Sequence, residues 1–308
     1  MPSGDGAGKI GDMRIAVTGA SGFLGSALVS ALHVDGHDVV RLVRRTAQAS
    51  DEVSWDPAAH DVDETALAGT EAVIHLAGVN VGGRRWSSSY RRKILGSRTE
   101  GTTTISQAVA RLDPQPAVLL SASAVGYYGD TGDRLVDESQ GPGSGFLADV
   151  VRQWEASTAP AEAAGVRVVH LRSGIVLAKT GGVLKPILPI FRLGLGGRLG
   201  SGRQYVSWIS LPDELAAIRF LLTASDIAGP VNLTAPDAVT NAEYTKAIGR
   251  AVHRPAVLPV PAGPLRLALD GLADEALLAG QRVRPRVLTE AGFAFAHPDI
   301  VTALRAVL

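Results

Sequence analysis

A short apolar strand that runs directly into a glycine-rich turn and then into a helix is the most constraining feature of this sequence. The strand is predicted at Arg14–Thr18, and the helical pattern follows at Ser26–His33. Glycines spaced three apart suit a tight turn, close backbone approach to a pyrophosphate and close helix packing, and a helix N-terminus attracts phosphate. A glycine turn without a ligand is the alternative. The predicted phosphate-binding residues are Gly19, Ser21, Gly22, Phe23, Leu24 and Gly25.

Short β-branched runs continue to alternate with longer helical patterns, which is typical of a parallel, doubly wound α/β sheet of the Rossmann type. After Leu177 the sequence becomes rich in Gly and Pro, which indicates a smaller, loop-rich C-terminal substrate lobe. We expect a disordered tail at 1–12, a nucleotide-binding domain at 13–177 and a substrate lobe at 178–308, with a segment near 212–234 returning to the sheet. The predicted strands are Arg14–Thr18, Asp38–Val43, Ala72–Ala77, Ala117–Ala122 and Val166–Arg172.

Composition excludes several classes of function. The 30 basic and 30 acidic residues among 308 cancel, so the long-range field that nucleic-acid binders use is missing. No cysteine is present and the histidines have no metal-ligand spacing, so we expect no metal site. No apolar run is long enough to span a membrane and no signal sequence is evident, which predicts a cytoplasmic protein.

The end of the second predicted strand indicates which dinucleotide is bound. NAD binding usually requires an acidic residue there, to accept hydrogen bonds from the ribose 2′-hydroxyl. The strand instead ends in Val43, Arg44 and Arg45. A guanidinium can bind a 2′-phosphate with two charge-assisted hydrogen bonds. The sequence therefore favours NADP(H), with Arg44 as the first candidate and solvated surface charge as the alternative for both arginines.

Segments beyond the glycine turn resemble one atypical subgroup of extended short-chain dehydrogenases/reductases, the sugar-nucleotide epimerase-like proteins, some of which are labelled cell-division inhibitors. The similar segments are residues 75–78, 85–98, 121–129, 171–177, 191–197, 200–203 and 280–283. For Lys93 and Arg98 a solvated helix face is the alternative, because five residues separate them by about 140° around a helix. The resemblance implies cofactor contacts at Val43, Arg44, Leu76, Ala77, Gly78, Lys93, Arg98, Ser121 and Ile175.

The catalytic residues depart from this resemblance. Relatives that transfer hydride use a Tyr-x-x-x-Lys pair on a helix, and this chain contains no such pair. The corresponding helix carries Phe146, Val150 and Trp154 on one face, which predicts packing. We expect Ser123 to hydrogen-bond the substrate and either Tyr127 or Tyr128 to donate a proton, with an aromatic wall as the alternative for both tyrosines. The predicted substrate-binding arginines of the C-terminal lobe are Arg198, Arg203 and Arg282.

Three classes of function remain compatible with the sequence. The first is an NADP(H)-dependent oxidoreductase or epimerase acting on a small molecule, with a nucleotide sugar as one candidate substrate. The second is an NADP(H)-sensing regulatory protein without turnover, and the third is an RNA-associated protein, which the balanced charge disfavours. We expect no nucleic-acid or membrane partner, and the resemblance allows a homodimer.

Overall fold

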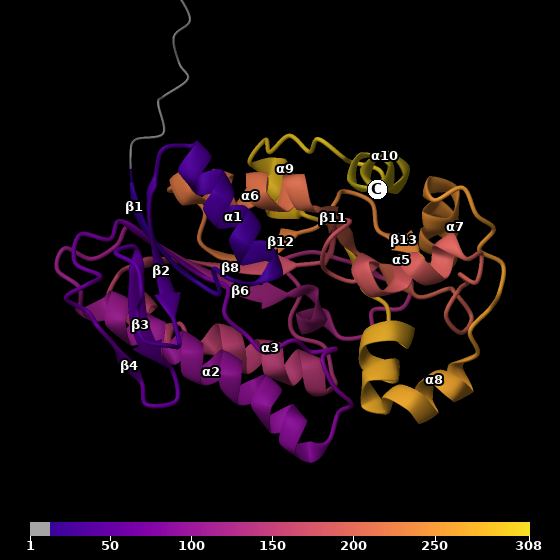
Figure 1. The fold of residues 1–308 in the computed structure, drawn as a ribbon, viewed down its shortest axis with the longest axis horizontal. Coiled ribbons are helices and arrows are strands. Elements are labelled where there is room, and N and C mark those ends of the chain that lie inside the picture. Colours follow the sequence, from indigo (N-terminus) through magenta and orange to yellow (C-terminus); the bar gives the residue numbers. More distant parts are fainter. Residues whose placement is uncertain (1–12) are drawn as a thin grey trace, which may run out of the picture.

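The computed structural model describes residues 13–308, and the tail expected at 1–12 lies outside the described residues. Its centre is an eight-stranded sheet with the order β12-β8-β6-β5-β1-β2-β3-β4 (Figure 1), in which every pairing is parallel except β3 with β4. The strands are β1 (Arg14–Thr18), β2 (Asp38–Val43), β3 (Glu52–Asp56), β4 (Asp61–Val62), β5 (Ala72–His75), β6 (Val118–Ala124), β8 (Arg167–Ser173) and β12 (Gly229–Leu233).

Helices cover both faces of this sheet. On one face α1 (Phe23–Val34) and α6 (Leu211–Thr223) share an apolar core with Ile15 and Val17 of β1. Ala16, between them, points to the opposite core because successive strand residues face opposite sides. That second face carries α2 (Ser88–Arg111), α3 (Phe146–Ala156) and α4 (Ala159–Ala163); α2 and α3 run side by side below the sheet in Figure 1.

The observed sheet confirms the predicted doubly wound α/β class, with a smaller C-terminal lobe. Each predicted strand has an observed counterpart, although β6 continues to Ala124, beyond the predicted end at Ala122. The sequence did not predict β3, which adds to the sheet beside β2. Strand β12 pairs with β8 and forms one edge, so residues 229–233 belong to the Rossmann sheet although they follow the glycine-rich segment.

The C-terminal lobe packs around a third apolar core that includes the fully buried Trp208. None of the helices within residues 13–308 is long and apolar enough to cross a lipid bilayer. The elements of the C-terminal lobe, together with those that connect the lobe to the sheet, are η1 (Val125–Tyr128), β7 (Leu135–Val136), β9 (Ile175–Leu177), α5 (Leu184–Arg192), β10 (Tyr205–Val206), β11 (Trp208–Ser210), β13 (Val239–Thr240), α7 (Asn241–Ala251), α8 (Ala262–Leu269), η2 (Ala273–Leu278), β14 (Arg282–Val283), α9 (Arg286–Glu290) and α10 (Ile300–Val307).

Candidate dinucleotide and catalytic site

The turn between β1 and α1 accepts only glycine at two of its positions. Gly19 has a φ of 69°, and a Cβ there would lie 2.9 Å from the carbonyl carbon of Leu76. A Cβ on Gly25 would lie 2.2 Å from the carbonyl oxygen of Gly19. Real Cβ atoms do not approach backbone so closely. The loop after β5 packs on Gly19, and the start of α1 packs on the turn, only because these two side chains are missing.

The turn leaves the start of α1 open to a ligand. Gly22 is the N-cap residue and provides no side-chain cap, and the first helical turn carries no acidic residue. The amides of Phe23 and Leu24 therefore lack intrahelical acceptors and lie at the positive end of the helix dipole. Ser21 is exposed beside them. This set of donors fits a pyrophosphate.

Thr18 joins the turn to the neighbouring strand end. Its Oγ1 accepts hydrogen bonds from the amides of Leu76 at 3.1 Å and Ala77 at 3.2 Å, and lies 2.8 Å from Nδ1 of His75. Complete burial lowers the pKa of His75 to about 4, so this imidazole stays neutral near pH 7. Ser121 faces His75 across the β5–β6 pair and is fully buried.

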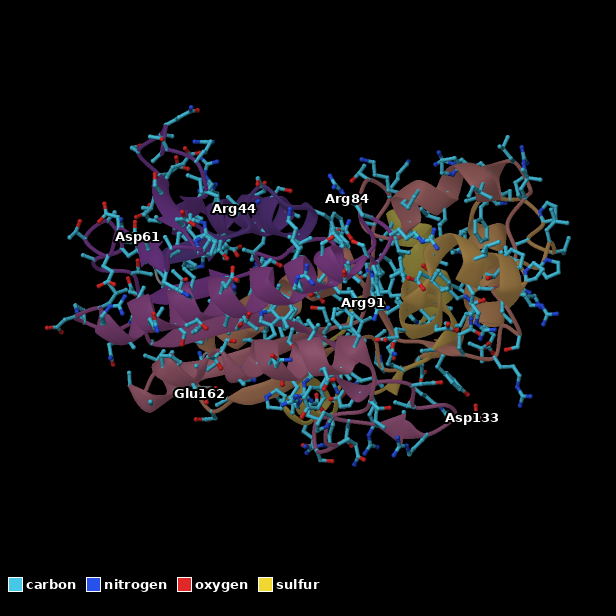
Figure 2. The ribbon with its side chains drawn as sticks, turned by 90° about the horizontal axis from the view of Figure 1, so that it is seen from below. Arg44, Asp61, Arg84, Arg91, Asp133 and Glu162 are labelled. Carbon is cyan, nitrogen blue, oxygen red and sulfur yellow. The ribbon has the colours of Figure 1, made fainter. Side chains whose placement is uncertain are left out.

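At the end of β2 three arginines lie close together in sequence but differ in their partners. Arg41 forms ion pairs with Asp51 and Glu52, and Arg45 holds Glu52 at 2.7 Å. The Arg45 contact lowers the pKa of Glu52 to about 2. Arg44 is exposed (Figure 2) and forms no ion pair with any residue between 13 and 308, so its guanidinium is the one available to a 2′-phosphate. Val43 precedes it and is half-buried.

The two basic residues predicted on α2 point in different directions. Arg98 turns inward, donates to the carbonyl oxygens of Val79 and Ile94, and lies 4.8 Å from the ring centre of Trp154. Burial lowers the pKa of Arg98 to about 10, so it remains charged. The Arg98 side chain packs against the loop after β5, where a Cβ on Gly78 would contact its guanidinium. Lys93 is exposed. The structure therefore does not bring Lys93 and Arg98 together.

The hydroxyl of Ser123 is already committed to a neighbouring side chain. It donates to Glu155 Oε1 at 2.6 Å, and the same carboxylate is held by Nε and Nη2 of Arg172, each at 2.8 Å. Ser123, Arg172 and Asn232 lie opposite one another in the registers of β6, β8 and β12. This row crosses the carboxyl ends of the strands, where ligands of doubly wound sheets bind.

The two candidate tyrosines have different surroundings. Tyr128 is buried, accepts from Arg172 at 3.0 Å and donates to Asn232 Oδ1 at 2.8 Å. Burial raises the pKa of Tyr128 to about 12, against the lowering effect of Arg172. Tyr127 is half-buried, and the Arg172 guanidinium carbon lies 3.5 Å from its ring centre. No residue between 13 and 308 hydrogen-bonds the Tyr127 phenol, and the ring lies against the positive charge of Arg172.

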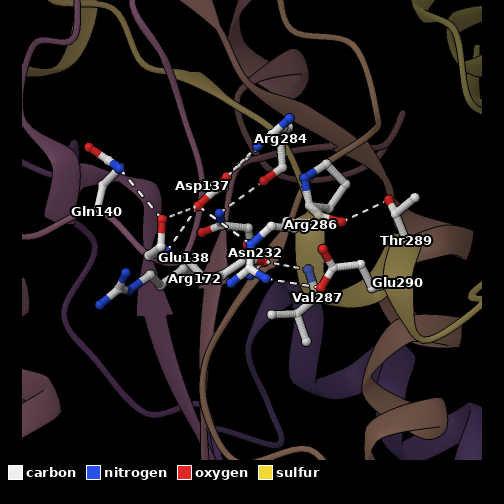
Figure 3. A network of polar contacts seen from close by, with 12 residues as sticks. Asp137, Glu138, Gln140, Arg172, Asn232, Arg284, Arg286, Val287, Thr289 and Glu290 are labelled. Carbon is white, nitrogen blue, oxygen red and sulfur yellow. Dashed lines mark hydrogen bonds and ion pairs between the residues drawn. The ribbon is translucent and has the colours of Figure 1, made fainter.

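Beyond Tyr128 the polar network continues into the C-terminal lobe (Figure 3). The amide of Asn232 donates to Glu138, and the Asn232 side chain donates to the carbonyl of Arg284. Arg284 in turn pairs with Asp137 at 2.6 Å. Sequence reasoning missed Glu155, Arg172 and Asn232. The available signal was a charged residue, Arg172, near the carboxyl end of a strand that is expected to be buried, because such a residue is buried only when it is paired.

The face of α3 that carries Phe146 and Val150 is packed against apolar side chains, as predicted. Phe146 packs edge-to-face on Trp86, and Val150 lies in the same apolar cluster. Arg91 covers both aromatic rings at 5.5 and 5.4 Å, and Figure 2 shows it between the Rossmann sheet and the C-terminal lobe. The face of α3 that Phe146, Val150 and Trp154 form therefore carries no side chain that could act as a proton-accepting base.

The three predicted substrate arginines have separate surroundings. Arg282 donates to the carbonyl of Asp133 and lies 4.8 Å from the ring centre of Tyr205. Arg203 is exposed, whereas Arg198 lines a pocket against α7. Ile175, the last predicted cofactor contact, pairs in register with Trp208 and is half-buried.

A doubly wound parallel sheet with an open glycine turn after its first strand defines a nucleotide-binding protein of the short-chain dehydrogenase/reductase class. Within that class the chain belongs to the NAD dependent epimerase/dehydratase family, which matches residues 15–234. Residues 260–307 match a domain of unknown function, DUF1731.

The similarity to individual proteins extends over nearly the whole chain. Epimerase family protein MT2273 of Mycobacterium tuberculosis is 49% identical over 290 residues, which cover 94% of this chain and 96% of that protein. YfhF of Bacillus subtilis is 35% identical over 95% of this chain and 97% of that protein. The human epimerase family protein SDR39U1, crystallised with NADPH, superposes with a TM-score of 0.87 at 32% identity, covering 96% of this chain and 99% of that one.

Proposed function

We propose that this protein binds NADP(H), with the pyrophosphate on the turn between β1 and α1 and the 2′-phosphate on Arg44. The observation that carries the proposal is the unpaired guanidinium of Arg44 beside two arginines that carboxylates already neutralise. The uncapped start of α1 supports it, because backbone amides there suit phosphate oxygens. The similarity to a human protein crystallised with NADPH points to the same cofactor.

The cofactor proposal is tested by calorimetry with NADPH and NADH. We expect Arg44→Ala to weaken NADPH binding about 10- to 100-fold, because bidentate charge-assisted hydrogen bonds to the 2′-phosphate are lost. Binding of NADH should barely change. Arg45→Ala is the matched control and should keep the preference for NADPH, since Arg45 is held by Glu52. Equal losses in the two variants would contradict the assignment to Arg44.

We further propose an oxidoreductase or epimerase-like reaction on a small carbonyl or hydroxyl compound, with a nucleotide sugar as the candidate substrate and Tyr127 as the proton donor. Bound NADPH would supply the hydride to a carbonyl carbon while Tyr127 gives the carbonyl oxygen its proton; with a hydroxyl compound the flow is reversed, so that bound NADP+ would accept the hydride and Tyr127 the proton. Tyr127 is favoured over Tyr128 because the Tyr128 phenol is buried and already donates to Asn232. Ser123 remains a candidate for orienting substrate, although it would have to share its hydroxyl with Glu155.

The reaction is tested by following deuteride transfer from NADPH labelled at the nicotinamide C4 into a panel of carbonyl compounds. We expect transfer by the wild-type protein, a loss of about 100-fold or more in Tyr127→Phe, and retention in Tyr128→Phe. Full activity in both variants would exclude a tyrosine donor.

An NADP(H)-sensing role without turnover is the second candidate. The packing of Phe146 and Val150 favours it, because these apolar side chains fill the face of α3 on which the resemblance to hydride-transferring dehydrogenases would place a Tyr-x-x-x-Lys pair. Leu272 of the C-terminal lobe belongs to the same cluster, which could couple cofactor binding to the position of that lobe. NADPH binding without deuteride transfer to any compound would favour this role.

A further inference from the structure

A pocket of about 750 Å³ opens in the C-terminal lobe between α7 and the segment that follows it. Its lining includes five basic side chains and no carboxylate. They come from three places along the chain: the segment before β10, the exposed side of α7 and the turn after α7. The five are Arg198, Lys246, Arg250, His253 and Arg254.

These basic side chains are not neutralised within residues 13–308. None of the five belongs to an ion pair, whereas Arg14, Arg41 and Arg219 elsewhere are all paired with carboxylates. Backbone carbonyls orient two of them: Arg198 donates to Ser201, and Arg254 donates to Arg192 and His253. Carbonyl partners fix a guanidinium without cancelling its charge, so the pocket concentrates positive potential.

The pocket is built by a specific ending of α7. The amide of Arg254 returns to the carbonyl of Gly249, and His253 has a φ of 56° in the left-handed region that usually takes glycine. A Cβ on Gly249 would lie 2.8 Å from the Cβ of Ala256, so glycine lets the segment after α7 close over the helix. The turn therefore places the His253 imidazole and the Arg254 guanidinium at the pocket. At position 253 glycine would be the least strained residue.

The pocket is separate from the proposed dinucleotide site. None of its lining residues belongs to the eight-stranded sheet, to the glycine turn or to the network around Arg172. The carbonyls of Gly196 and Arg198 accept from the amides of Leu258 and Val260, so this segment is extended as far as Arg198, and successive residues face opposite sides. Arg198 lines the pocket beside α7, whereas Gly200, where a φ of 55° ends the extended run, lies against Leu278 on the side of η2.

We propose that this pocket binds a small phosphate-bearing molecule that also carries an apolar part, at a second site independent of the dinucleotide. Phosphate oxygens suit the guanidinium and ammonium groups. Pro255, Ala256 and Val257 supply an apolar wall. The volume lies in the range of ligand sites and exceeds the needs of one phosphate group.

The probes are ADP and inorganic pyrophosphate for a soluble ligand, and vesicles of phosphatidylglycerol against phosphatidylcholine for a lipid headgroup. Full-length protein is titrated by calorimetry with and without saturating NADPH, and vesicle binding is measured by co-sedimentation. The test variant is Lys246→Gln/Arg250→Gln, with Arg250→Gln alone as a milder change. Arg134→Gln is the control, because Arg134 is also exposed and lies outside the pocket.

We expect ADP to bind NADPH-saturated protein more tightly than pyrophosphate does. In the double variant the affinity for ADP should fall at least about tenfold. Arg134→Gln should leave binding unchanged, and unaltered NADPH affinity in all variants would show that they fold. Vesicle binding with the same variant dependence would support the phosphate site with a lipid as its source. The proposal is overturned if no probe binds, or if the double variant binds the probes as tightly as Arg134→Gln does.

Discussion

Glu214 is a fully buried carboxyl group in the first turn of α6, outside the proposed reaction. Its Oε1 accepts the hydroxyl of Ser173 at 2.6 Å, while Oε2 has no hydrogen-bond partner within residues 13–308. Burial raises the pKa of Glu214 to about 8. The folded protein therefore holds the Glu214 carboxyl group protonated at neutral pH, whereas an exposed glutamate is ionised at that pH.

Glu214 makes stability depend on pH with a definite sign. Between the ordinary pKa near 4.5 and the folded value near 8, the unfolded chain releases this proton and the folded chain keeps it. The contribution of Glu214 to the free energy of unfolding therefore falls as pH rises, by about 1.4 kcal/mol per unit at most, and levels above pH 8. We expect Glu214→Gln to gain stability relative to wild type across this range in urea denaturation.

The matched control for that titration is Glu243→Gln. Glu243 caps Thr240 at the start of α7, and its hydrogen bonds lower its pKa, so it does not titrate between pH 5 and 8. This variant should lose stability by a similar amount at every pH in the range. Parallel stability curves for wild type and Glu214→Gln would show that Glu214 is ionised when folded.

At the scale of helices and strands, features that depend on a few consecutive residues were predictable from the sequence, whereas contacts between distant residues were not. The glycine turn and the buried strands were predictable, because their signals lie within a few consecutive residues. Strand β3 was not predicted: Glu52–Asp56 does alternate polar with apolar residues, but it is only five residues long, and Glu52 is buried through its ion pairs with Arg41 and Arg45, which no local pattern shows. The contact of Ser123 with Glu155 spans 32 positions and depends on how α3 lies on β6, which no local pattern encodes.

The start of α1 gives a test at the scale of one element. Gly25→Ala places a methyl group 2.2 Å from the Gly19 carbonyl oxygen, so the turn must open. We expect a loss of about 2 kcal/mol or more in the free energy of unfolding and at least tenfold weaker NADPH binding. Gly263→Ala, in α8, meets nothing within 4 Å and should be neutral or slightly stabilising. NADPH affinity retained by Gly25→Ala would disconnect the turn from cofactor binding.

At the scale of the whole molecule, the sheet and the C-terminal half share one core. Ile218 and Leu221 of α6, Val231 of β12 and Leu288 of α9 lie in the same apolar cluster as Ile15 of β1. The Rossmann sheet is therefore incomplete without residues from beyond 178. A second contact joins the halves where Leu272 packs with Trp86.

This shared core predicts that residues 13–177 do not fold alone. The fragment lacks β12 and α6, so β8 becomes an exposed edge and the face of the sheet that α1 and α6 share keeps only α1 as cover. We expect the full chain to unfold in a single calorimetric transition, and the fragment to show no cooperative transition. A fragment ending at 240, which retains both elements, should recover part of that cooperativity. Cooperative unfolding of 13–177 would instead show that α6 and β12 are additions to an already stable domain.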